Sequence, residues 1–236
     1  MSAPAVPIVA IDGPAGAGKS TVARQLARRL GFTMVDTGAI YRALALDARR
    51  SGVEWDDDQG LRKLLEGGFA LQFVAPPPEA PTEAQRVLLR GQDVTQAIRT
   101  PEISRGSSQV SARPVVREKL LGLQRALGLT AAHGAVLEGR DIGTVVFPDA
   151  AAKFFLTASD EARALRRHAE LTEKGLAVTL AEVLADQRRR DQDDSERAIA
   201  PLKPAADAIL VDTTGMELEQ VIDRCLELAR ARLGAR

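Results

Sequence analysis

The sequence predicts an α/β fold, with a five-stranded parallel sheet covered by helices on both faces. Five short apolar runs, rich in β-branched or aromatic residues, each end in a polar residue and are separated by helical stretches. The runs begin near residues 6, 32, 135, 153 and 208. A glycine-rich segment, residues 13–20, leads from the first run directly into a helical pattern. This alternation of strand and helix is typical of a parallel sheet.

The glycine-rich segment fits the pattern G-x-x-x-x-G-K-[ST] and reads Gly13-Pro14-Ala15-Gly16-Ala17-Gly18-Lys19-Ser20. The apolar run Val6–Ile11 precedes it, and apolar residues at helical spacing follow it between Ser20 and Leu30. Glycines let backbone amides close around phosphate oxygens, and the positive end of the following helix favours an anion. Lys19 would add a charge for the β- and γ-phosphates, and the Ser20 hydroxyl would bind Mg²⁺. The segment therefore predicts binding of a nucleoside triphosphate.

The composition excludes several other classes. A chain of 236 residues is long enough for one α/β domain with insertions or for two small domains. The 32 basic and 32 acidic residues cancel, so no overall field attracts nucleic acid or acidic membranes. The single cysteine, Cys225, excludes a disulfide within the chain and a thiolate metal site. No apolar run is long enough to span a membrane and no leader is evident, so we expect a cytoplasmic protein.

Polar residues follow the second and third apolar runs. Asp36 and Thr37 end the second run, and Glu138, Arg140 and Asp141 end the third. In open parallel sheets, ligands bind beyond the carboxyl ends of the strands. We therefore expect these five residues on the same edge of the sheet as the glycine-rich segment.

Residues 69–99 interrupt the alternation of strand and helix. Residues 69–74 alternate between apolar and polar, prolines follow at 76–78 and 81, and Val87–Leu89 precedes a Gly91-Gln92 turn. This pattern predicts a small antiparallel insertion.

A charged helix, Leu180–Arg197, is the second interruption. A solvated helix face with pairs such as Arg190–Asp194 explains such a run without any function. Beside a triphosphate-binding loop, the same cations suit a helix that covers the phosphates. Both interpretations stay open at this point.

Three kinds of triphosphate-using protein can be compared, and RNA binding is a further alternative. The chain contains no asparagine, so the guanine-reading motif Asn-Lys-x-Asp of switch GTPases is absent, although a nucleotide-dependent binding switch is an alternative. Leu137-Glu138 is a weak match to the catalytic strand of a motor ATPase. An aromatic content of 3% argues against RNA binding by base stacking. A kinase acting on a small phosphorylated acceptor needs cations for a second phosphate, and Arg42, Arg117 and Arg140 suit that role.

Several motifs, in this order along nearly the whole chain, resemble bacterial cytidylate kinases. They are residues 13–21, the segment 36–42, the block Glu138–Asp149, and the Arg190-Asp191, Asp194, Arg197 and 200–202 positions. The resemblance implies a P-loop kinase that transfers a phosphoryl group from ATP to CMP, and to dCMP, giving CDP or dCDP and ADP in pyrimidine nucleotide metabolism. A kinase for UMP, another monophosphate or a non-nucleotide acceptor is the alternative.

The resemblance also implies the organisation of the chain and its partners. Residues 1–236 would form a single domain with three parts: a core (about 1–68, 129–175 and 198–236), a monophosphate-binding region with the β insert (about 69–128) and a short helical lid (about 176–197). The expected partners are ATP, CMP or dCMP, and Mg²⁺, with no nucleic acid or membrane, and the expected state is a monomer.

The resemblance assigns roles residue by residue. Lys19, with Arg188 and Arg190, would act on the transferred phosphoryl group. Ser20 would bind Mg²⁺, and a role for Glu138 near the metal is left open. The ATP phosphates would be bound by Gly13, Pro14, Ala15, Gly16, Ala17, Gly18, Lys19, Ser20 and Thr21. CMP would be bound by Thr37, Tyr41, Arg42, Ser108, Arg117, Arg140, Asp141, Asp194 and Arg197.

Overall fold

The computed structural model describes residues 6–75, 77, 85–173 and 175–234. Within this part of the chain, the fold divides into two compact units, each described by itself. The first unit consists of residues 1–35 and 124–236, and the second of residues 36–123. The predicted boundaries of the core, the monophosphate-binding region and the lid stay predictions, because compact units and functional regions are different divisions of a chain.

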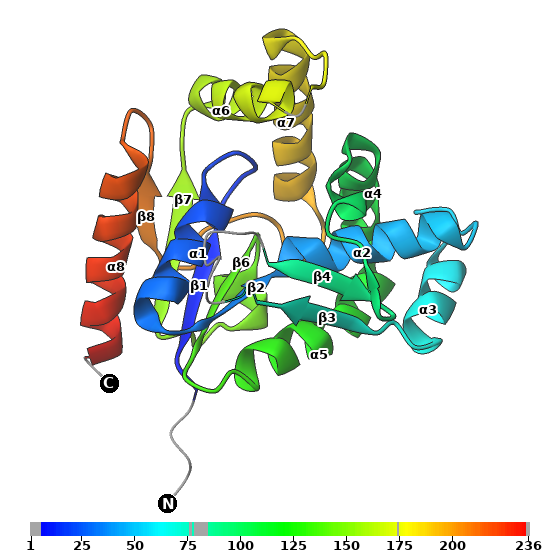
Figure 1. The fold of residues 1–236 in the computed structure, drawn as a ribbon, viewed down its shortest axis with the longest axis horizontal. Helices are drawn as coiled ribbons and strands as arrows, with labels where there is room; N and C mark the ends of the chain where they lie inside the picture. The colour runs from blue at the N-terminus through cyan, green and yellow to red at the C-terminus, as the bar shows by residue number, and fades with distance from the viewer. Residues whose placement is uncertain (1–5, 76, 78–84, 174, 235–236) are drawn as a thin grey trace, which may run out of the picture. The chain divides into compact units, whose positions relative to one another are not determined.

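A five-stranded sheet in the order β2-β6-β1-β7-β8 forms the centre of the first unit (Figure 1). Its strands are β1 (Ile8–Asp12), β2 (Thr33–Asp36), β6 (Ala135–Gly139), β7 (Ala152–Thr157) and β8 (Ile209–Asp212). The pairs β1–β6, β1–β7 and β7–β8 are parallel. The five strands match the five predicted apolar runs, and the parallel α/β fold is confirmed.

Helices cover both faces of this sheet. On one face, α1 (Lys19–Leu30) and α8 (Leu218–Gly234) pack against alternate residues of β1, β7 and β8, including Ile11, Phe154 and Val211. On the other face, the last turn of α5 (Pro114–Leu129) lies against β6, since a Cβ built on Gly128 would be 3.4 Å from Leu137 Cδ1. The alternation of side chains along each strand supplies an apolar surface to both layers.

The junction between β1 and α1 depends on glycine. A Cβ on Gly13 would lie 2.0 Å from the carbonyl oxygen of Leu156, so the neighbouring strand β7 leaves room for hydrogen only. Gly18, in the left-handed conformation (φ 86°), is the N-cap of α1, and Gly31 (φ 70°) ends the helix. The sequence thus places a tight loop at the carboxyl end of β1.

Two further helices, α6 (Asp160–Glu173) and α7 (Leu180–Glu196), follow β7 in the first unit. Thr179 caps α7 through a capping box with Glu182, which fixes the start of this helix. Between β6 and β7, residues Ile142–Val146 form a short π-helix, η2.

In the described part of the second unit, the first part of α5 is joined by three longer helices and a small sheet. They are α2 (Thr37–Arg50), α3 (Asp58–Glu66), α4 (Pro101–Ala112), the short 3₁₀ helix η1 (Ala97–Arg99), and the strands β3 (Leu71–Val74), β4 (Arg86–Leu89) and β5 (Gln92–Asp93). Both strand pairs are antiparallel, so the predicted antiparallel insertion is confirmed. Of the predicted proline segment, Pro76, Pro78 and Pro81 lie outside the described residues.

Candidate active site

The phosphate loop (residues 13–20) connects β1 to α1 in the first unit. Gly16 and Gly18 adopt positive φ angles of 76° and 86°, which L side chains rarely adopt. The Lys19 ammonium donates a hydrogen bond to the carbonyl oxygen of Pro14 at 2.7 Å, and the Lys19 side chain is buried. The loop therefore closes around its own lysine.

The surroundings of Lys19 disfavour its charged, protonated form. Burial, and secondarily repulsion by Arg140, lower the pKa of Lys19 from 10.5 to about 7. Glu138, Asp194 and Asp12 act in the opposite direction. A polyanion bound in the loop would favour the charged lysine, so the site suits phosphate groups.

A hydroxyl and a carboxylate meet at the start of α1. Ser20 Oγ donates a hydrogen bond to Glu138 Oε2 at 2.8 Å, and Glu138 is buried at the end of β6. Oxygen ligands of this kind suit Mg²⁺, which usually keeps several waters and substrate phosphate oxygens. The described residues include no group of three or more His, Cys, Asp or Glu that could hold a metal. This donor set fits a metal that is held partly by nucleotide phosphates.

A buried carboxylate at the end of β1 holds the segment after β6. Asp12 accepts hydrogen bonds from the amides of Ile142 and Gly143 at 2.8 and 2.7 Å. Burial raises the pKa of Asp12 to about 6, although the two hydrogen bonds act to lower it. These bonds fix η2, and with it the preceding Arg140-Asp141 pair, against the strand that leads into the phosphate loop.

Arg140 and Arg197 both pair with Asp194, near the end of α7. Arg140 Nε lies 2.8 Å from Asp194 Oδ2, and Arg197 Nη1 lies 3.3 Å from Asp194 Oδ1. Burial opposes the charge on Asp194, but Arg140 and Arg197 outweigh it and lower the pKa of Asp194. Burial likewise opposes the charge on Arg140, and Asp194 raises the pKa of Arg140 overall. Three of the predicted CMP-binding residues thus form one charged cluster, and Asp141 is buried beside Arg140.

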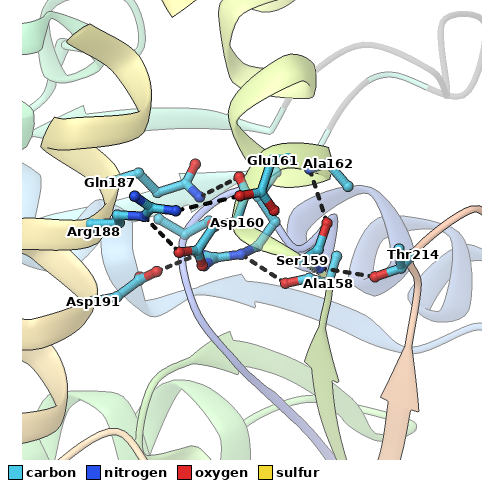
Figure 2. Close-up of polar contacts among 11 residues, drawn as sticks. Ala158, Ser159, Asp160, Glu161, Ala162, Gln187, Arg188, Asp191 and Thr214 are labelled. Carbon is cyan, nitrogen blue, oxygen red and sulfur yellow. Dashed lines mark hydrogen bonds and ion pairs between the residues drawn. The ribbon is translucent and has the colours of Figure 1, made fainter. Parts of the chain in front are cut away.

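The two arginines predicted to reach the transferred phosphoryl group lie in different surroundings. Burial lowers the pKa of Arg190, and repulsion by Arg140 lowers it further. The side chain of Arg188 is 56% exposed and pairs instead with Asp160 and Glu161 of α6 (Figure 2). Arg190 therefore belongs to the charged cluster, whereas Arg188 does not. The catalytic roles of both stay predictions.

Arg42, in the second unit, is held at the start of α2. Its Nη2 lies 2.8 Å from Asp36 Oδ2, and Asp36 also caps α2 by accepting a hydrogen bond from the Ala39 amide. The Nε atom of Arg42 is buried and has no hydrogen-bond partner among the described residues. A buried donor without an acceptor is costly, which is consistent with a site that an anion completes.

Tyr41, Arg117 and Ser108 are also in the second unit. The Arg117 guanidinium lies 5.6 Å from the centroid of the Tyr41 ring, and Arg117 Nε donates to the carbonyl oxygen of Ser111 at 2.7 Å. Both side chains are buried. Ser108 lies on α4, and its hydroxyl donates to the carbonyl oxygen of Ser104 in the same helix at 3.5 Å. Thr37, the first residue of α2, is buried as well.

Sequence reasoning missed Asp12 and Arg163. Asp12 directly precedes Gly13, and its position at the polar end of a buried strand was a usable signal. Arg163 is a buried arginine on α6 that hydrogen-bonds the carbonyl oxygen of Ala15, 148 residues away. No local pattern indicates such a contact.

A parallel sheet, a glycine loop with a buried lysine, and a serine–carboxylate pair beyond the carboxyl ends of the strands define a P-loop nucleotide-binding protein. The family model for cytidylate kinase matches residues 9–231. The chain belongs to the cytidylate kinase family and is an enzyme of the nucleoside monophosphate kinase class.

Curated relatives agree with the family match. The chain is 52% identical over 219 residues to a cytidylate kinase of Pseudomonas paraeruginosa, covering 93% of each chain. It is 49% identical over 225 residues to a cytidylate kinase of Syntrophotalea carbinolica, covering 95% of this chain and 92% of the relative.

Solved structures include one with the same fold. An uncharacterized protein from Eubacterium ventriosum has a TM-score of 0.52 at 11% identity, over 95% of this chain and 99% of that one. This likeness shows the fold alone. Among the helices that the structure describes, none is both long and apolar enough to cross a membrane.

Proposed function

We propose that the enzyme transfers the γ-phosphoryl group of ATP to CMP, and to dCMP, giving CDP or dCDP and ADP. One observation carries the proposal most directly: Asp12, which precedes the phosphate loop, pairs with Gly139 and accepts hydrogen bonds from the amides of Ile142 and Gly143, on either side of Arg140. The lysine of the phosphate loop and an arginine of the Gly-Arg-Asp block are therefore within electrostatic reach of each other. Two cations this close suit two phosphate groups between which a phosphoryl group moves.

The donor would bind at residues 13–21. Backbone amides of the loop would surround the phosphates, and Lys19 would neutralise charge on the β- and γ-phosphates. Ser20 and Glu138 would hold Mg²⁺, which supplies charge neutralisation at the phosphate oxygens when bound. The hydrogen bond between these two side chains supports this assignment.

The acceptor phosphate would be bound by Arg42 and Arg140, and Arg197 would contact the ribose and phosphate. Arg190 would act on the transferred phosphoryl group. Arginine presents parallel N–H donors that match phosphate oxygens, which makes it suited to this task. Asp194 would bind the ribose and keep Arg140 and Arg197 in place. The Nε of Arg42, which has no hydrogen-bond partner in the described part of the chain, supports a role in anion binding.

The cytosine base would be recognised by Ser108, Arg117 and Asp141. A carboxylate accepts a hydrogen bond from the exocyclic amine of cytosine, which uracil lacks. A buried acceptor left without its donor disfavours the wrong base, so Asp141 would select CMP over UMP. Thr37 and Tyr41 would pack against the nucleotide.

The reaction needs no general base. The attacking atom is a phosphate oxygen that is already ionised at neutral pH, so positioning and charge stabilisation provide the catalysis. The expected cytoplasmic location and monomeric state stay predictions.

The test is the release of ADP from Mg·ATP with and without CMP. We expect strong stimulation by CMP in the wild-type enzyme, and a loss of turnover by roughly two orders of magnitude or more in Lys19→Ala. The folded state of this variant is checked by circular dichroism. ADP release that is independent of CMP, or near-normal turnover in Lys19→Ala, would contradict the proposal.

A further inference from the structure

Arg163 binds four oxygen atoms from three parts of the first unit. Its guanidinium donates to the carbonyl oxygen of Ala158 at 3.0 Å and to Asp160 Oδ1 at 2.6 Å, both near the start of α6. It also donates to the carbonyl oxygen of Ala15 at 2.9 Å and to Asp191 Oδ2 at 2.5 Å. Arg163 is 4% exposed, so these bonds are shielded from water.

One face of α7 is held by the first turn of α6. Gln187 Nε2 donates to the carbonyl oxygen of Asp160 at 3.4 Å, and Arg188 Nε donates to Asp160 Oδ2 at 2.8 Å (Figure 2). Asp191 lies one turn further along the same face. The charged cluster of Arg190 and Asp194 occupies the adjacent face of this helix.

The phosphate loop packs tightly against the same residues. A Cβ on Gly16 would lie 3.1 Å from Arg163 Cβ and 3.3 Å from Gln187 Oε1. The turn of the loop is therefore tightly packed against side chains of α6 and α7. A change in loop conformation would act directly on Arg163 and Gln187.

Asp191 depends on Arg163. Within the described ranges its one ion pair is with Arg163, and its other oxygen, Oδ1, is buried without a hydrogen-bond partner. The side chain of Asp191 is only 18% exposed, and a largely buried carboxylate that loses its cation is destabilised, so α7 would shift to expose Asp191 further to water.

We propose that Arg163 is a positioning residue that couples the phosphate loop to α7, so that a nucleotide bound in the loop orders the helix carrying Arg190 and Asp194. This proposal rests on the proposed function for its effect on turnover, but not for the coupling itself. The planar guanidinium is suited to the task, because one rigid group bonds the Ala15 carbonyl and the Asp191 carboxylate at once. All four of these bonds go to oxygens of the protein itself, so Arg163 would act through the backbone of the loop and through Asp191.

The test measures hydrogen exchange of the amides of residues 180–196 with and without Mg·AMPPNP. In the wild-type enzyme, we expect the nucleotide to slow exchange in this segment roughly tenfold or more. In Arg163→Lys and Asp191→Asn, we expect less than about a twofold effect at saturating nucleotide. Arg189→Met is the matched control, because Arg189 lies on α7 but forms an exposed pair with Asp186. In Arg189→Met, the nucleotide should slow hydrogen exchange of residues 180–196 as much as in the wild-type enzyme.

Turnover gives a second readout. Arg163→Lys should lower kcat about tenfold or more while the KM for ATP changes less than about threefold, since misplacing a catalytic group mainly affects the chemical step. Arg163→Met is added as a more severe variant. If Arg163→Met does not fold, Arg163→Lys and Asp191→Asn alone test the proposal.

The outcomes separate the two proposals. Slowing of exchange that persists in both conservative variants, or that is absent in the wild-type enzyme, overturns the coupling whatever the turnover. Wild-type slowing that is lost in the variants supports the coupling, even if CMP proves not to be the acceptor. Failure of the wild-type enzyme to use CMP overturns the proposed function alone.

Discussion

Arg140 and Asp194 form an ion pair at 2.8 Å between the segment after β6 and the end of α7. Both side chains are largely buried, so solvent screens their interaction weakly. Because Arg197 pairs with the same carboxylate, Asp194 holds two of the proposed acceptor-binding arginines at once. The acceptor side of the proposed reaction is therefore organised by one acidic residue.

Asp194→Asn should weaken CMP binding. The amide keeps the shape of the side chain but leaves Arg140 and Arg197 to repel each other without a neutralising charge. We expect kcat/KM for CMP to fall roughly tenfold to a hundredfold, with the KM for ATP little changed, as measured by steady-state ADP release. Asp193→Asn, which changes an exposed neighbour on the same helix, is the control. An equal loss in both variants would assign the effect to the helix rather than to the ion pair.

Asp141→Ala should relax the choice of base. Removing the buried carboxylate removes both the acceptor for the cytosine amine and the penalty for uracil. We expect the CMP/UMP ratio of kcat/KM to fall by roughly tenfold or more. This ratio is measured from the initial rates of the wild-type enzyme and the variant with CMP and with UMP. An unchanged ratio would remove Asp141 from the base site.

Binding of Mg·ADP should take up a proton at Lys19. The pKa of Lys19 in the free enzyme is about 7, so the side chain is mostly neutral at pH 8 and mostly charged at pH 6. If the phosphates restore the charge, uptake is about 0.9 proton at pH 8 and about 0.1 at pH 6. Titration calorimetry in two buffers of different ionisation enthalpy measures the number of protons taken up on binding. Lys19→Arg should show no uptake, and equal uptake at both pH values in wild type would contradict this assignment.

Asp12 should make the native state more stable as the pH falls. Its pKa is about 6 in the folded protein against an ordinary value of 3.8, so the native state binds a proton that the unfolded chain binds only below about pH 4. The cost of the buried charge is present in full above pH 6 and is relieved as the pH falls through 6.

The size of this effect follows from the same pKa values. Between pH 7.5 and pH 5, the free energy of unfolding of wild type should rise by about 1.4 kcal/mol relative to Asp12→Asn, which carries no charge. Urea unfolding of both proteins across this range measures the difference. A difference that stays constant with pH would show that Asp12 has an ordinary pKa in the folded protein.

The strands were predictable, but their ends were not. The apolar run at residues 135–137 predicts a strand, whereas β6 continues through Glu138 and Gly139. These residues extend the ladder because Glu138 pairs with Ile11 and Gly139 pairs with Asp12. A polar residue at the end of a strand looks like a loop in the sequence, and only the register of the partner strand shows otherwise.

The site was predictable where the chemistry follows local spacing. The phosphate loop is a contiguous motif, and Arg190, Asp194 and Arg197 follow one another at helical intervals, which predicts a shared face. Arg188 shows the limit of such reasoning. Its neighbours in sequence suggest a role at the phosphates, yet Asp160 and Glu161, about 27 residues earlier, provide its partners. Contacts of this kind depend on how α6 and α7 pack, which no spacing along one helix can indicate.

The most direct test of the central claim is ADP release from Mg·ATP with CMP, dCMP, UMP, AMP and GMP at equal concentrations. Strong stimulation by CMP and dCMP, weak stimulation by UMP and none by the purine nucleotides is the predicted result. It would establish both the phosphoryl transfer and the cytosine preference assigned to Asp141. Stimulation by another acceptor in preference to CMP would contradict the base assignment. No stimulation by any of the five would contradict the proposed reaction.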